Sequence, residues 1–124
     1  LRPLGRPGDR AMTYDEVRRM VLAWPGVEDG TSYGTPALKI KGKFFTRLKE
    51  DGDTLVIKHV DPDERDMLME SAPDIFYITD HYKGWPMVLM RLSKAHPDQV
   101  KALLLRSWKA TAPKKLVQEF AEKP

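Results

Sequence analysis

Two short motifs in this sequence carry residues that can perform catalysis, but neither has the surroundings that its chemistry requires. The run from Gly30 to Gly34 matches G-x-S-x-G, in which a nucleophilic serine occupies a sharp turn between a buried strand and a helix. Here Pro36 follows almost at once and the chain then alternates like a strand, so the pattern predicts a turn. The run HPD at residues 96–98 is typical of a helix start. We therefore expect no catalytic residue and no enzymatic activity.

The histidines are spaced too widely along the chain to suggest a metal pair. They are His59, His81 and His96, and none lies at the i, i+2 or i, i+4 spacing that brings two imidazoles to one ion. A site would need all three to converge by folding, or to recruit Asp61 or Asp80. No phosphate-binding glycine loop leads from a strand into a helix. We expect no metal ion and no cofactor.

Cysteine is absent from the 124 residues. Its absence excludes disulfides, thiolate catalysis and cysteine-based zinc or iron–sulfur sites, and it is typical of a reducing cytosol. No apolar run reaches the roughly 18 to 20 residues of a membrane span, and no signal peptide is recognisable at the start. The sequence therefore predicts a cytoplasmic protein that makes no use of a membrane.

Much of the basic net charge comes from the start of the chain. The formal net charge is +3, but residues 1–11 hold three arginines and one aspartate, which leaves +1 for residues 12–124. The segment is rich in glycine and proline and has no apolar period, so we interpret residues 1–11 as a disordered leader or a tag. A basic arm that binds nucleic acid is the alternative. Residues 12–124 are expected to form a single domain.

The first element that must position any site is a helix. Thr13 and Glu16 form a capping box, and apolar residues recur at helical spacing from Val17 to Trp24. Pro25 and the glycine after it end the helix. Residues 27–36, which contain two glycines and a proline, suit either a short edge strand or a loop.

An antiparallel meander is predicted from Ala37 to His59. Apolar and polar residues alternate with a period of two on both sides of Gly42, and again after the turn at residues 51–53. Two consecutive hairpins of this kind have one buried face and one wet face. This meander is the centre of the predicted sheet.

The second half of the sequence adds helices and two more strands. Helices are predicted to start at Asp61-Pro62, at Pro97 and, for a short last one, at Pro113, with strands at residues 75–78 and 87–92. The order is α-β-β-β-α-β-β-α-α. The fold class is therefore α+β with an antiparallel sheet.

One face of the predicted meander gathers basic side chains. Under strict alternation its wet face carries an aromatic residue among lysines and an arginine, and a further lysine stands at the hairpin tip. Such a face can neutralise phosphates and stack on or wedge between bases. The alternative is that lysines on an exposed sheet maintain solubility. The candidate nucleic-acid-binding residues are Lys39, Lys41, Lys43, Phe45, Arg47 and Lys58.

A second candidate site is a cleft in which aromatic and proline residues lie beside glycines. Its predicted lining is Tyr33, Pro36, Tyr82 and Trp85. Apolar clefts with a few polar groups are typical of ligand sites. The corresponding hypothesis is a non-enzymatic adaptor that binds a protein partner or a small ligand there.

Several segments together resemble the MmcQ/YjbR family of small bacterial proteins. Their order and spacing cover nearly all of residues 12–120. They are WPGVE at residues 24–28, YGTPA at 33–37, IKGKFF at 40–45, LVIK at 55–58 leading into Asp61-Pro62, and YKGWPMV at 82–88. The chain departs from the family pattern in the proline after Trp85 and in the basic leader.

The resemblance implies a two-layer α/β sandwich of the type α-β(3)-α-β(2)-α, similar to type III secretion chaperones, to which this chain adds a short C-terminal helix. It also implies a double-wing arrangement of hairpins, for which family members are commonly labelled DNA-binding. The leading hypothesis is therefore a DNA-binding domain of low sequence specificity. A monomer or a weak dimer is expected.

Overall fold

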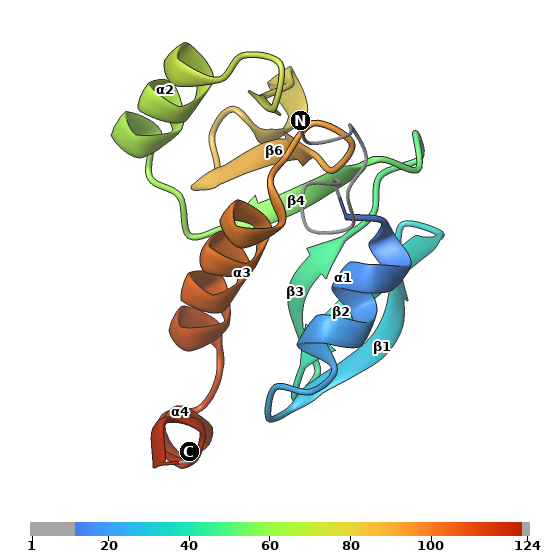
Figure 1. Ribbon diagram of the computed structural model, residues 1–124, viewed down its shortest axis with the longest axis vertical. Helices are drawn as coiled ribbons and strands as arrows, with labels where there is room; N and C mark the ends of the chain where they lie inside the picture. Colours follow the sequence, from blue (N-terminus) through green and yellow to red (C-terminus); the bar gives the residue numbers. More distant parts are fainter. Residues whose placement is uncertain (1–11, 123–124) are drawn as a thin grey trace, which may run out of the picture.

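The structure, a computed structural model, describes residues 12–122 of the chain. The described residues form helices and antiparallel strands (Figure 1), which confirms the predicted α+β class. The proposed leader at residues 1–11 lies outside them. In order, the elements are α1 (Tyr14–Val21), β1 (Val27–Ser32), β2 (Thr35–Ile40), β3 (Lys43–Arg47), β4 (Thr54–Lys58), α2 (Pro62–Ser71), β5 (Phe76–Tyr77), the short 3₁₀ helix η2 (Asp80–Tyr82), β6 (Met87–Arg91), α3 (Pro97–Thr111) and α4 (Lys114–Glu122).

The helices start where their capping residues predict. The Thr13 hydroxyl accepts a hydrogen bond from the Glu16 amide at 3.2 Å, and the Glu16 carboxylate accepts one from the Thr13 amide at 2.9 Å. Asp61 caps α2 by accepting from the amide three residues on. His96 caps α3 through Nδ1, so the HPD run is a helix start, as expected.

The strands form two small sheets rather than one. β1, β2 and β3 pair in that order, and β4 pairs with β6, which also pairs with β5. The segment left open between strand and loop thus contains a true strand, β1. The predicted hairpin between β3 and β4 is present only next to its turn, and the ladder of β4 is formed with β6 instead.

The two sheets diverge soon after the turn that joins β3 to β4. Leu48 and Leu55 form an isolated bridge, and the Lys49 amide donates to the Thr54 carbonyl at 2.8 Å. Further along, the Thr46 hydroxyl donates to the Val56 carbonyl at 2.8 Å, in the place of a backbone partner. Because this carbonyl is satisfied by a side chain, β3 and β4 can separate without leaving it unpaired.

The helices cover one face of both sheets and enclose the main core. This core joins residues of α1, β2, β3, β4, β6 and α3, and side chains of α2 and α4 pack against its edge. At its centre the Trp24 and Trp108 rings meet edge-on at 6.3 Å, and the Phe120 ring of α4 lies 5.0 Å from Trp108. In Figure 1, α1 lies over the β1–β3 sheet and α3 runs beside β3. This leaves the other face of the sheets for a site.

That second face, called the outer face here, is only partly covered. Val56 of β4 and Leu89 of β6 are buried there beneath Tyr82 of η2. The segment from η2 to the start of β6 therefore acts as a short cover over the β4–β6 pair. The neighbouring β1–β3 sheet has no helix on this face among the described residues.

Candidate functional site

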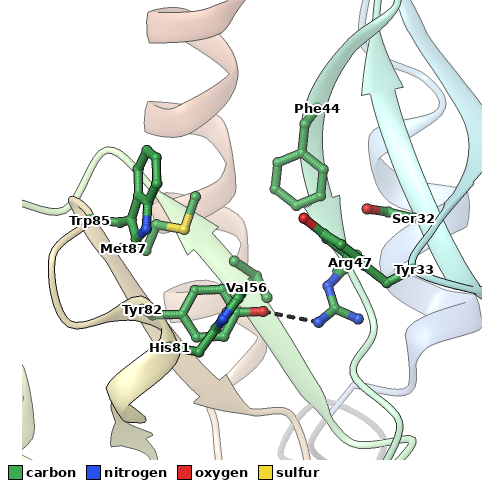
Figure 2. Close-up of a pocket in the computed structure, with 9 residues that line it drawn as sticks. All are labelled: Ser32, Tyr33, Phe44, Arg47, Val56, His81, Tyr82, Trp85 and Met87. Atoms are coloured by element: carbon green, nitrogen blue, oxygen red, sulfur yellow. Dashed lines mark hydrogen bonds between the residues drawn. The ribbon is translucent and has the colours of Figure 1, made fainter.

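A pocket of about 340 Å³ opens on the outer face, where the two sheets diverge. Figure 2 shows Trp85, Met87 and Tyr82 on one side of it and Phe44, Arg47 and Tyr33 on the other. The walls are mainly aromatic. The lining residues are Ser32, Tyr33, Phe44, Arg47, Val56, His81, Tyr82, Trp85 and Met87.

A β-bulge decides which residues of β3 face the pocket. Leu38 pairs with Thr46 while the next residue, Lys39, pairs with Phe44, so one extra residue of β3 lies between them. The bulge breaks the period-two alternation, as an inserted residue must. Phe44 and Arg47, three positions apart, therefore share the outer face, and Phe45 turns into the core, where it is 0% exposed. The prediction that Phe45 lies on the wet face is wrong.

Tyr33 reaches the pocket from the turn between β1 and β2. Tyr33 and Gly34 both have positive φ, 53° and 77°, as a two-residue type I′ hairpin turn requires. The G-x-S-x-G run is therefore a hairpin turn, as expected, with no helix after the serine. Tyrosine is a poor residue for this conformation, since its Cβ crowds the backbone at positive φ. The side chain is nonetheless 79% exposed.

Arg47 places a buried cation in the pocket wall. The residue is 5% exposed, and its Nη2 donates to the Tyr82 hydroxyl at 2.9 Å (Figure 2). Its Nη1 donates to Thr35 Oγ1 at 3.1 Å and to Glu50 Oε2 at 3.5 Å. The guanidinium also lies 5.2 Å from the centre of the Tyr33 ring. Arg47 thus links β3 with both sides of the pocket, and it was predicted instead as a solvent-facing phosphate contact.

The Trp85 side of the pocket is held from α2. Arg65 of α2 is 7% exposed, and it donates to three backbone carbonyls, those of Lys83 at 3.3 Å, Trp85 at 2.9 Å and Met87 at 3.2 Å. A guanidinium offers several donors in one plane, so it can fix several carbonyls of one loop. These hydrogen bonds anchor the loop to α2 while Trp85 remains 60% exposed.

The predicted basic residues do not all lie free on one surface. Lys41 and Lys43 are exposed on either side of Gly42 at the tip of the β2–β3 hairpin. Lys39 lies on the outer face because it pairs with Phe44. Lys58 Nζ donates to the Phe44 carbonyl at 2.7 Å and lies 5.7 Å from that ring's centre. Burial, and then the charge of Lys43, lower the pKa of Lys58. The lysines remain candidates, but Phe45 and Arg47 do not stand exposed among them.

Comparison with known proteins places the chain in a family. The sequence profile of the YjbR family matches residues 22–110, which is more than half of the chain and includes every residue that lines the pocket. The chain belongs to the YjbR family. Similar proteins include an uncharacterised protein of Mycobacterium bovis and two of Mycobacterium tuberculosis, each 29% identical over 107 residues that cover 84% of this chain and 76% of the relative. No solved structure gives a significant match.

The YjbR chain brings together three of the four residues predicted for a cleft. Tyr33, Tyr82 and Trp85 line the same pocket, whereas Pro36 does not. Pro36 follows the hairpin turn in β2, where its carbonyl accepts from the Leu48 amide at 3.0 Å. The neighbouring Thr35 accepts from Arg47 on the pocket side of β2, so Pro36 faces the opposite side of the sheet.

Sequence reasoning missed the pocket residues whose orientation depends on the bulge or on distant contacts. Phe44 is displaced by the bulge, and His81 and Met87 flank the two predicted aromatic residues of the cover. The phenylalanine pair at residues 44–45 indicates that one of the two rings faces outward, because adjacent residues of a strand face opposite sides, but it does not say which one. The missed lining residues are Ser32, Phe44, Val56, His81 and Met87.

Two further features of this YjbR chain bear on its chemistry. Within residues 12–122, no three histidine, aspartate or glutamate side chains gather in a way that could hold a metal ion. None of the helices in that range is both long enough and apolar enough to cross a membrane. The pocket itself offers aromatic faces and one guanidinium that is hydrogen-bonded to a hydroxyl group.

Proposed function

We propose that this YjbR domain is a non-enzymatic binding module that holds a small ring-containing ligand in the outer-face pocket. The volume of about 340 Å³ lies at the lower end of the range of small-molecule sites, roughly 300 to 1,000 Å³. A single or a fused double ring fits such a space. The aromatic walls offer offset-stacked and edge-on contacts to it.

The observation that carries this proposal is the conformation of Tyr33. An exposed aromatic residue at positive φ costs roughly 1 kcal/mol or more, and an asparagine would avoid that cost in the same turn. Tyr33 gains little core contact in return, since it is 79% exposed. Local strain kept at the rim of a pocket is typical of a functional position.

The test replaces Tyr33 by asparagine and compares the result with a matched control. The β2–β3 turn has the same geometry, with Lys41 at φ 50° and Gly42 at φ 83°, and it does not line the pocket. We expect Lys41→Asn to raise the free energy of unfolding by about 1 kcal/mol, and Tyr33→Asn to raise it by less, because that change also removes the contact of the ring with Arg47. Only Tyr33→Asn should weaken ligand binding.

Binding is measured with a panel of neutral, anionic and cationic single-ring compounds. Amide chemical shifts in NMR spectra and the fluorescence of Trp85 report it, because Trp85 is 60% exposed while Trp24 and Trp108 are buried. A ligand that binds the folded state must also raise the melting temperature by mass action. If no compound of any charge shifts the pocket amides, the proposal is wrong.

DNA binding is the second candidate, and the β2–β3 hairpin tip supports it. Lys41 and Lys43 are exposed there, and Lys43 is close enough to Lys58 to lower its pKa. Such a cluster favours phosphate contacts and predicts a steep loss of affinity with salt. The double variant Lys41→Glu, Lys43→Glu should abolish binding of a fluorescent duplex, whereas Tyr33→Asn should not. Binding that is independent of both salt and these lysines would contradict this candidate.

A further inference from the structure

The charge of Arg47 is only partly compensated within the protein. Three of its hydrogen bonds are assigned above, two of them to hydroxyl groups. At least two of the five N–H groups of the guanidinium therefore have no partner among residues 12–122. The one carboxylate that reaches it, from Glu50, does so at 3.5 Å, and its side chain is 65% exposed. A cation that is 5% exposed usually has a closer anionic partner.

Two lysines add to the positive charge at the pocket. Lys49 Nζ lies 5.3 Å from the centre of the Tyr82 ring, and Lys58 Nζ lies 5.7 Å from that of Phe44. With Arg47 on Tyr33, three aromatic rings of the pocket each carry a basic group on or near their face. None of the nine lining residues is acidic. In a partly dry site, such a field attracts an anion.

We infer that the ligand is a small aromatic anion, a ring that bears a carboxylate or a phosphate, with its acid group on Arg47. The inference rests on the proposed function and adds the charge of the ligand to it. The ring lies among Tyr33, Phe44 and Trp85. The acid group takes the unused N–H donors of Arg47, which pair well with two oxygens of one oxyanion.

The experiment uses four probes of similar size and different charge: benzoate, phenyl phosphate, benzyl alcohol and benzylamine. Each is titrated into the full chain and followed by the amide shifts of the pocket residues. We expect the two anions to bind at least about tenfold more tightly than benzyl alcohol, since hydrogen bonds to charged groups are worth that much. Benzylamine should bind most weakly.

Three variants test whether Arg47 causes the preference for anions. Arg47→Gln should remove the preference for anions. Glu50→Gln removes the competing carboxylate and should tighten anion binding a few fold without changing the affinity for benzyl alcohol. Lys109→Gln on α3 removes one positive charge from an exposed position on the helical side of the sheets, and it should change nothing.

The outcomes separate this inference from the proposed function. Equal affinity for benzoate and benzyl alcohol overturns the inference and leaves the ring-binding pocket intact. Absence of binding by all four probes overturns both. If Arg47→Gln does not fold, Arg47→Lys decides, because it keeps the positive charge but loses the paired N–H donors, and an unchanged affinity for both anions would show that the guanidinium does not hold the acid group.

Discussion

Alanine substitutions at Phe44 and Phe45 separate the bulged strand from a regular one. Phe45 is 0% exposed and its ring lies 6.4 Å from that of Trp24 in the core. Phe45→Ala should therefore lower the free energy of unfolding by about 3–5 kcal/mol, as large-to-small changes in a core do. Phe44 is half-buried at the pocket wall, so Phe44→Ala should cost only about 1–1.5 kcal/mol, half of a buried phenylalanine.

Urea denaturation followed by tryptophan fluorescence measures both values, because Trp24 and Trp108 are buried in the core next to the site of the change. An unchanged m-value shows that the comparison is between equally cooperative transitions. Phe44→Ala should also weaken ligand binding, whereas Phe45→Ala should not. If Phe44→Ala proves the more destabilising of the two, the register of β3 is wrong and Phe45 returns to the exposed face. Phe45 would then again be a candidate for base contacts in the DNA-binding hypothesis.

Three further substitutions test residues that affect the stability of the fold. Arg65→Met should lower the free energy of unfolding by about 2–4 kcal/mol and speed amide exchange in residues 83–87, because three backbone carbonyls of this loop lose their hydrogen-bond donor. Slow exchange in these residues would contradict this role of Arg65. Burial, and then the charge of Lys58, lower the pKa of His59, so its protonation favours the unfolded state and stability falls as the pH drops below 6.5. His59→Asn, which suits the positive φ of 64°, should flatten the change in urea midpoint between pH 7 and pH 5. Burial raises the pKa of Tyr14 to about 12, so the free energy of unfolding should fall above pH 10, where tyrosine ionises in the unfolded chain. Tyr14→Phe should remove that fall. It should not lower stability at pH 7, since the buried hydroxyl has no hydrogen-bond partner among the described residues.

The parts of the fold that local chemistry dictates could be predicted from the sequence. The capping box of Thr13 and Glu16, and the helix starts at Asp61 and His96, depend on residues within four positions of one another. The turns at Gly34 and Gly42 follow in the same way from the need for positive φ. Each of these signals is complete in a short window, so distant parts of the chain do not alter it.

The parts that depend on pairing could not be predicted in this way. The bulge in β3 exists only in the register with β2, and strict alternation places Phe45 and Arg47 on one face until that register is known. The ladder of β4 is formed with β6, which lies about thirty residues further along the chain. The sequence contains no local sign of either event.

The candidate site shows the same division. Tyr33, Tyr82 and Trp85 could be grouped because aromatic residues beside glycines suggest the rim of a cleft. Arg47 could not be placed, because the hydroxyl that holds it belongs to Tyr82, 35 positions away. A basic residue on the wet face of a predicted meander is most simply interpreted as exposed, and only the fold shows that this one is buried.

Two departures from ordinary local rules meet at the pocket. Tyr33 has a backbone conformation that asparagine or glycine would adopt at a lower energetic cost. Arg47 is a buried charge, and a methionine at this position would avoid the cost of removing that charge from water. Either one alone could be an accident of the fold. They lie in contact, with the guanidinium 5.2 Å from the centre of the tyrosine ring, and both face the same cavity. Both departures carry a cost to folding, so their joint presence argues that the cavity is where this YjbR domain functions.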